Sequence, residues 1–136
     1  MTKSRTILTV LALSTIVMAG CSQKYSAERD GKKLGEAICD LREADSTEEA
    51  DAALEDINEQ LDDLGNKYAL YTAEDRSDVQ NNLADLHEHI IQGQPNLAMQ
   101  DLAVLERSSD NIADDVNEVA RAAWEGVLEG TADCTQ

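Results

Sequence analysis

The chain contains few aromatic residues and few residues that favour turns. Phenylalanine is absent, aromatics amount to 3% of the residues, and the single proline is Pro95. Strands are enriched in aromatic and β-branched side chains, and no stretch here alternates apolar and polar residues over the length of a strand. A core made of Leu, Ile, Val and Ala suits helices better, so the sequence predicts an all-α fold.

Motifs with recognisable chemistry are also missing. There is no glycine-rich phosphate loop, no Gly-x-Ser-x-Gly elbow and no Cys/His set with zinc spacing. The only histidines, His87 and His89, lie two residues apart and so point to different sides of a helix. Asp85 could share a face with His89, but this makes only a weak metal-ligand pair, because di-iron bundles need Glu-x-x-His on two helices. We therefore expect no enzymatic activity, no metal and no cofactor.

The first 20 residues have the pattern of an export signal. Lys3 and Arg5 precede an uncharged run from Thr6 to Gly20 that is mostly Ile, Leu, Val, Met and Ala. A membrane-spanning helix needs about 20 predominantly apolar residues, and this run is shorter. The pattern predicts a signal peptide over residues 1–20, and not a transmembrane helix.

The residues Met18-Ala19-Gly20-Cys21 resemble the lipobox of bacterial lipoproteins, with Met18 in the place where Leu is usual. The resemblance covers residues 1–21 only. It implies cleavage before Cys21 and attachment of a diacylglyceryl group, with acyl chains such as palmitate, to the Cys21 thiol. Two acyl chains anchor a protein stably to a bilayer. The alternative is an ordinary signal peptide cut near the same place.

This resemblance also implies a location. A protein acylated at Cys21 is anchored by lipid to the extracytoplasmic face of the cell membrane. In a bacterium with two membranes, Ser22 after the cysteine permits sorting to the outer membrane. The expected partners are the lipid bilayer, through acylated Cys21, and a protein at the membrane surface.

Basic residues are scarce in the part that follows the signal. Its 116 residues, enough for one small domain, contain 28 acidic residues and nine bases, a formal net charge of −19. Because phosphate contacts depend on Lys and Arg, nucleic acid is excluded as a partner. Ten acids and no base lie from Glu43 to Asp63. Such a run is typical of a solvated helix face, and binding of a cationic partner or a divalent ion is the alternative.

Four of the nine bases lie close to the expected anchor. They are Lys24, Arg29, Lys32 and Lys33. One interpretation is that this basic segment rests on anionic lipid headgroups, at about 1 kcal/mol for each base near the surface. The other is that a helix start and a solvated surface have produced the cluster without any role at the membrane.

Capping signals and apolar spacing predict about four helices. Ser26 can cap a first helix that runs to about Ala44. The capping box Ser46 to Glu49 opens a second helix, which we expect to pass through Gly65 and reach about Tyr71. Thr72 to Asp75 repeats the capping signal before a third apolar stripe that ends at Ile90.

The turn at Gln92 to Asn96 is the clearest in the chain. After it, the apolar spacing continues to Gly130, and the likeliest break in this long stretch is Arg107 to Asn111. Stripes of this kind bury one another in a bundle. The sequence therefore predicts a small antiparallel bundle over residues 27–136, behind an acylated tether of residues 21–26.

Small residues form a line along the first predicted helix. Ala27, Gly31, Gly35 and Cys39 are spaced four apart. Glycine in a helix costs about 1 kcal/mol relative to alanine, so two at this spacing indicate that another backbone passes close by. The alternative is a first helix that is partly unwound.

Cys39 and Cys134 remain after Cys21 is assigned to the lipid. In an exported protein a disulfide is the expected state of such a pair. A ring of about 100 residues adds about 4.7 kcal/mol in the chain-entropy model. Two free thiols or a redox pair is the alternative, although no Cys-x-x-Cys spacing supports it. Trp124, the single tryptophan, is expected to pack in the core, and the alternative is an exposed anchor for a partner.

The sequence as a whole predicts a lipid-anchored, non-enzymatic helical protein that acts as an interaction, accessory or scaffold protein of the cell envelope. The alternative is a helical lipoprotein that binds an apolar ligand or a cation between its helices. A filled core with an exposed apolar strip favours the first hypothesis. A cavity lined by Leu and Val favours the second.

Overall fold

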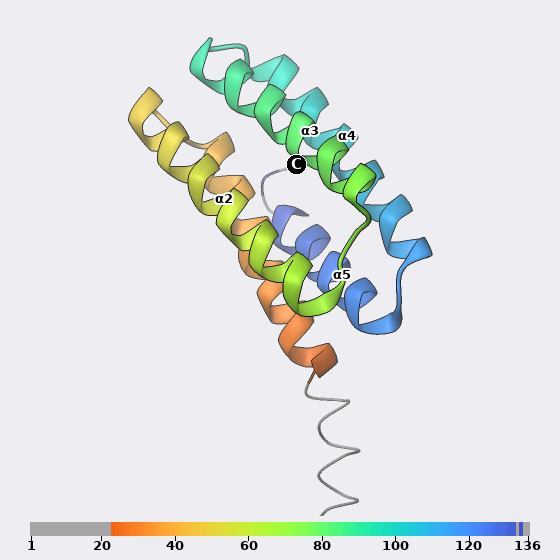
Figure 1. Ribbon diagram of the computed structural model, residues 1–136. Helices are drawn as coiled ribbons and strands as arrows, with labels where there is room; N and C mark the ends of the chain where they lie inside the picture. The colour runs from red at the N-terminus through yellow and green to blue at the C-terminus, as the bar shows by residue number, and fades with distance from the viewer. Residues whose placement is uncertain (1–22, 133, 135–136) are drawn as a thin grey trace, which may run out of the picture.

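The computed structural model describes residues 23–132 and Cys134. Five helices account for almost all of this part of the chain, which contains no strand (Figure 1). The first helix covers residues 23–42. It is followed by α2 (Thr47–Tyr68), α3 (Ala73–Ile91), α4 (Pro95–Asp115) and α5 (Glu118–Ala132). The all-α prediction is confirmed, and the number of helices is five where the sequence indicated about four.

Two of the three predicted N-terminal caps are present; the prediction for Ser26 is wrong, because this residue lies inside the first helix, which is already helical at residue 23. The Ser46 hydroxyl accepts a hydrogen bond from the Glu49 backbone N–H at 3.2 Å, and Thr72 accepts one from Asp75 at 3.1 Å. The Glu49 carboxylate in turn accepts from the backbone N–H of Asp45, at 3.0 Å. These side chains satisfy backbone donors that a helix start leaves free, and so fix where α2 and α3 begin.

Helix α2 passes through Gly65, as predicted, but ends three residues before the expected Tyr71. Ala69 adopts a left-handed conformation with φ 52° and ψ 51°, which stops the helix after Tyr68. The next residues fold back onto the bundle, because the Tyr71 hydroxyl donates to the carbonyl of Leu61 at 2.8 Å. These tertiary contacts override the apolar spacing that predicted a longer helix.

The prediction of a break at Arg107 to Asn111 is wrong. Helix α4 continues through this segment, where the buried Ser109 donates its hydroxyl proton to the Leu105 carbonyl at 2.8 Å. The break lies at Val116, which has an extended backbone. Asn117 then caps α5, since its side-chain oxygen accepts from the Ala120 N–H at 2.9 Å.

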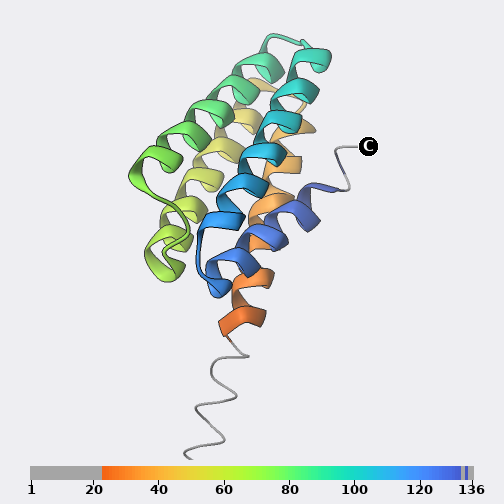
Figure 2. The same ribbon diagram turned by 90° about the vertical axis from the view of Figure 1, so that its right-hand side faces the viewer.

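Successive helices run up and down the long axis of the bundle (Figures 1 and 2). The hairpin of α3 and α4 forms the most extensive contact between the labelled helices. Because there are five helices, the first helix and α5 point in the same direction, so the bundle is antiparallel between neighbours in sequence but parallel at this contact. None of the helices in the described part has the length and apolar character needed to span a membrane.

The core is filled by aliphatic side chains from all five helices. The largest fully buried side chain is that of Trp124. The other core positions follow the apolar spacing of the sequence, for example Ile38, Ile57, Leu83 and Leu102. Burial of these stripes against one another accounts for the stability of helices that are individually amphipathic.

Candidate functional site

The three cysteines have different places in the molecule. Cys21, the predicted site of lipid attachment, lies outside the described residues. Cys39 and Cys134 form the expected disulfide, with their Cα atoms 5.7 Å apart and both side chains buried. The bond joins the end of the first helix to the residues that follow α5.

Beside this disulfide, the first helix and α5 meet through glycines, which we call the glycine seam: Gly31, Gly35, Gly126 and Gly130. A Cβ atom added to Gly31 would lie 1.9 Å from the Ala123 carbonyl oxygen, and one added to Gly126 would lie 2.0 Å from that of Glu28. The prediction that another backbone passes close to Gly31 and Gly35 is confirmed. The backbone that passes close by is that of α5, which contributes a second pair of glycines spaced four apart, Gly126 and Gly130. The same spacing in the sequence could have identified this partner.

Trp124 is a packing residue. It is 1% exposed, and its Nε1 donates to the Leu70 carbonyl at 2.8 Å. Its ring meets that of Tyr71 edge to face, with the centroids 6.3 Å apart. Burial raises the pKa of the Tyr71 phenol. Trp124 therefore holds the turn between α2 and α3 against α5.

The two histidines connect α3 to different neighbours. His87 Nε2 lies 2.7 Å from a carboxylate oxygen of Asp51 on α2, and His89 Nδ1 lies 2.5 Å from one of Asp101 on α4. The hydrogen bond that His89 donates to the Asp101 carboxylate raises the pKa of His89 above its usual value. The prediction that these side chains point to different sides of the helix is confirmed.

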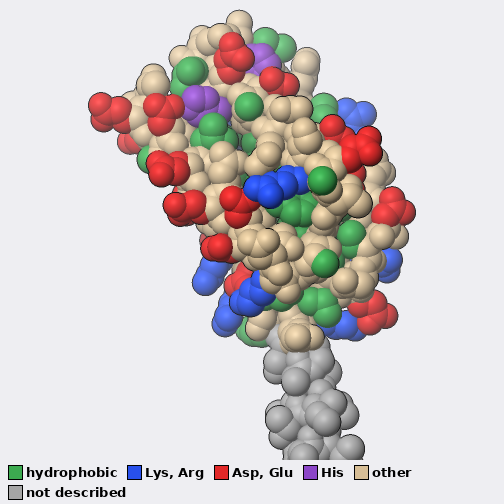
Figure 3. All heavy atoms as spheres, in the orientation of Figure 1, with side chains coloured by type: hydrophobic (Ala, Val, Ile, Leu, Met, Phe, Trp, Pro, Cys, Tyr) green, Lys and Arg blue, Asp and Glu red, His purple; other side chains and the backbone are tan. Residues whose placement is uncertain are grey.

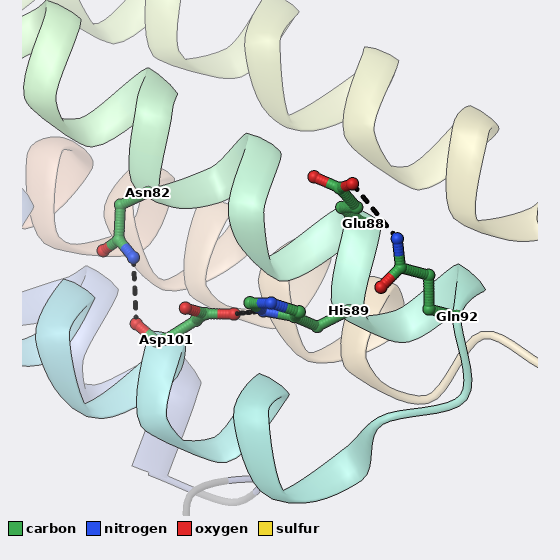
Figure 4. Close-up of polar contacts among 5 residues, drawn as sticks. All are labelled: Asn82, Glu88, His89, Gln92 and Asp101. Carbon is green, nitrogen blue, oxygen red and sulfur yellow. Dashed lines mark hydrogen bonds and ion pairs between the residues drawn. The ribbon is translucent and has the colours of Figure 1, made fainter.

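Figure 4 shows the pair of His89 and Asp101 between α3 and α4. Asn82 lies on the same side of α3 and donates its amide Nδ2 to the backbone carbonyl of Asp101 at 3.2 Å. Its Oδ1 atom is buried without a hydrogen-bond partner among the described residues. Both polar contacts therefore converge on Asp101, and they fix α4 against α3.

Two of the four basic residues near the start of the first helix form ion pairs with α5. Lys24 lies 2.8 Å from the Glu118 carboxylate, and Lys32 lies 3.6 Å from Glu129. The hydrogen bond from Lys24 lowers the pKa of Glu118. Arg29 lies over the Tyr25 ring, 5.9 Å from its centroid. Figure 3 shows basic side chains at the lower end of the molecule, beside the start of the first helix.

The acidic run from Glu43 to Asp63 begins in the turn before α2 and continues along most of that helix, with its acidic side chains at the surface. All of its acidic residues are exposed, as expected for a solvated helix face. Figure 3 shows acidic side chains at the upper left, over the first turns of α2. Within residues 23–132 and Cys134, no group of three or more His, Cys, Asp or Glu side chains is arranged to hold a metal ion.

A shallow groove of about 250 Å³ lies between the first helix and α2. Five of its six lining residues have polar or charged side chains, among them Asp30, Lys33 and Lys67, and the sixth is Leu64. The Asp30 carboxylate accepts from the Tyr68 hydroxyl at 2.9 Å and lies 3.5 Å from Lys67 Nζ. Burial of the Tyr68 phenol raises its pKa, and the hydrogen bond to Asp30 raises it further. This groove is not the Leu- and Val-lined cavity that the ligand-binding hypothesis requires.

Three large apolar side chains are exposed on the α3–α4 hairpin, and Tyr25 is exposed near the start of the first helix. Ile91 at the end of α3 is 42% exposed, and Leu97 and Val104 on α4 are 38% and 42% exposed. Figures 1 and 2 place the turn that joins α3 to α4 at the end of the bundle farthest from the start of the first helix. A filled core with such a strip is what the interaction hypothesis predicts.

No family model, no curated protein and no solved structure matches this chain.

Proposed function

We propose that the protein is a non-enzymatic, lipid-anchored interaction protein of the extracytoplasmic membrane surface, attached through acylated Cys21 and acting as an accessory or scaffold subunit. The observation that carries this proposal is the exposed apolar strip of Ile91, Leu97 and Val104. Soluble monomers rarely leave large apolar patches uncovered, and those that do commonly use them to bind a partner.

The layout of the domain supports the same function. The described chain begins at the end of the bundle opposite the turn between α3 and α4, beside which Ile91 and Leu97 lie (Figure 1). An anchor before residue 23 therefore leaves the strip directed away from the bilayer, where a partner can reach it. The glycine seam and the disulfide between Cys39 and Cys134 join the first helix to α5. These contacts hold together the domain that presents the strip.

The anchor is tested by fractionating cells that produce the full chain or its Cys21→Ser variant. The native protein should remain with the membranes and carry lipid on mass spectrometry. The variant should be unprocessed or appear in the soluble fraction. Membrane retention of Cys21→Ser equal to that of the native protein would contradict the lipid anchor.

The interaction is tested by chemical crosslinking in intact membranes, followed by purification of the protein and its adducts. We expect one or a few adducts of defined mass, formed by the anchored protein and reduced for Cys21→Ser, which is displaced from the membrane surface. An anchored protein that forms no adduct beyond the background of random membrane proteins would contradict the interaction role.

A further inference from the structure

The end of the α3–α4 hairpin differs in composition from the rest of the domain. Residues 89–100 contain no Asp, Glu, Lys or Arg, although charged residues make up 29% of the chain, and this is the longest uncharged run after Cys21. We call residues 89–104 the hairpin tip. Depletion of charged residues, together with exposed aliphatic side chains, is the composition typical of the centre of a protein interface.

The single carboxylate of the hairpin tip is already engaged. Asp101 lies four residues after Leu97 and three before Val104, so the three side chains share one side of α4. The Asp101 carboxylate is bonded to His89 of α3 at 2.5 Å (Figure 4). The strip therefore presents an aliphatic residue, an internally paired carboxylate and a second aliphatic residue, at low cost of desolvation for a partner.

Acidic side chains border the hairpin tip. Asp85 and Glu88 are exposed on α3, and the charges of both act on His89 at the start of the hairpin tip. A second copy of the chain would bring the same carboxylates together, because a symmetric contact uses the same patch on both partners. A partner with Lys or Arg around an apolar centre would meet complementary charge instead.

We propose that the hairpin tip binds a protein segment that has an aliphatic face flanked by Lys or Arg. This inference rests on the proposed function and names the surface and the chemistry of the partner. Leu97 and Val104 form the centre of the contact. The carboxylates of Asp85 and Glu88 form its rim, where they attract the basic residues of the segment.

The test uses a photo-crosslinking amino acid, benzoylphenylalanine, in the full chain in intact cells. It replaces Leu97 in one variant and Val104 in a second. The matched control carries it at Ala52, which is exposed on the acidic face of α2. We expect the Leu97 and Val104 variants to yield a common adduct whose crosslinked peptide is aliphatic with adjacent Lys or Arg, and the Ala52 variant to yield little of it.

A charge change separates apolar docking from simple electrostatic attraction. Leu97→Asp adds a negative charge, so it should strengthen binding if the partner is merely attracted to acid. Our proposal expects the opposite, a decrease of about tenfold in the adduct formed from position 104, as is usual for a residue at the centre of an interface. Ala52→Asp, with the same added charge elsewhere, should leave this yield within about twofold.

Several results would overturn the proposal. These are an adduct equally strong from Ala52, an adduct with a second copy of the chain or with lipid, or no adduct from either tip position. They are counted only where each variant remains in the membrane fraction. A variant that folds but leaves the membrane with its Cys21 intact contradicts the proposed anchoring instead, so the two failures are distinguishable.

Discussion

Two of the helix contacts in this bundle are built in opposite ways. The first helix and α5 approach through the glycine seam, where backbone meets backbone and the disulfide of Cys39 and Cys134 closes one end. Helices α3 and α4 are held apart by large side chains and joined by His89 and Asp101. A contact between backbones tolerates no added atom, whereas one between side chains can adjust by repacking. Stability should therefore respond very differently to small changes at the two places.

The largest effect is expected from removing the disulfide. Replacing both Cys39 and Cys134 with Ala releases a loop of 95 residues in the unfolded chain, which should cost about 4 kcal/mol of unfolding free energy. Urea denaturation of the variant and the native protein measures the difference. A loss below about 1 kcal/mol would mean that the glycine seam holds the first helix in place without the covalent bond.

A single methyl group in the glycine seam should have the next largest effect. Gly31→Ala improves helix propensity by about 1 kcal/mol, yet its Cβ would collide with the Ala123 backbone carbonyl, which cannot rotate away. We expect a net loss of about 3 kcal/mol. The measurement is thermal or urea unfolding of the full chain.

The matched control for this change is Gly93→Ala. Nothing lies within 4 Å of the added Cβ, and the only cost is the left-handed backbone at φ +69°, about 1 kcal/mol. If Gly31→Ala costs no more than this control, the contrast between the two helix contacts is wrong.

A change in side-chain shape in the α3–α4 hairpin should destabilise the protein less than a methyl group added in the glycine seam. Leu86 is buried on α3, and Leu86→Met keeps its volume while adding flexibility. We expect a loss of less than about 1.5 kcal/mol, measured in the same unfolding assay. A loss larger than that of Gly31→Ala would show that the side-chain contact is the stricter of the two.

The smallest effect is a dependence on pH at the α3–α4 contact. Asp101 raises the pKa of His89 in the folded state above the unfolded value. The stabilisation from this pair is therefore complete below the unfolded pKa and is lost as the pH rises through the folded pKa. We expect His89→Gln to lower the melting temperature more at pH 5.5 than at pH 8.5. Equal shifts at both pH values would contradict an ion pair at this position.

Local signals in the sequence located the starts of α2 and α3, but neither the start of the first helix nor the end of α2. Ser46 and Thr72 act through side chains a few residues away, so the sequence alone locates these caps. The end of α2 depends on Trp124, which lies 54 residues after Leu70. The indole N–H of Trp124 donates a hydrogen bond to the Leu70 carbonyl. Such a contact is not visible in the spacing of apolar residues.

In the candidate site, too, some features could be predicted from the sequence and others could not. The small residues Gly31 and Gly35 predicted a close backbone, and the two remaining cysteines predicted a disulfide, because each pattern has few physical explanations. The exposed strip of the hairpin tip could not be predicted. The spacing of Ala98, Leu102 and Leu105 predicts that Ala98 is buried and leaves Leu97 off this stripe. Only the packing of α4 against its neighbours shows that the Leu97 side chain is uncovered.

The parallel pairing of the first helix with α5 also has a consequence for how the chain folds. The α3–α4 hairpin joins segments that are adjacent in sequence and can form early, because its contacts close short loops. The first helix can pair with α5 only after the other helices have been synthesised. Cys39 can form its disulfide only once Cys134 is present. The residues beside the predicted anchor are thus among the last to reach their native contacts.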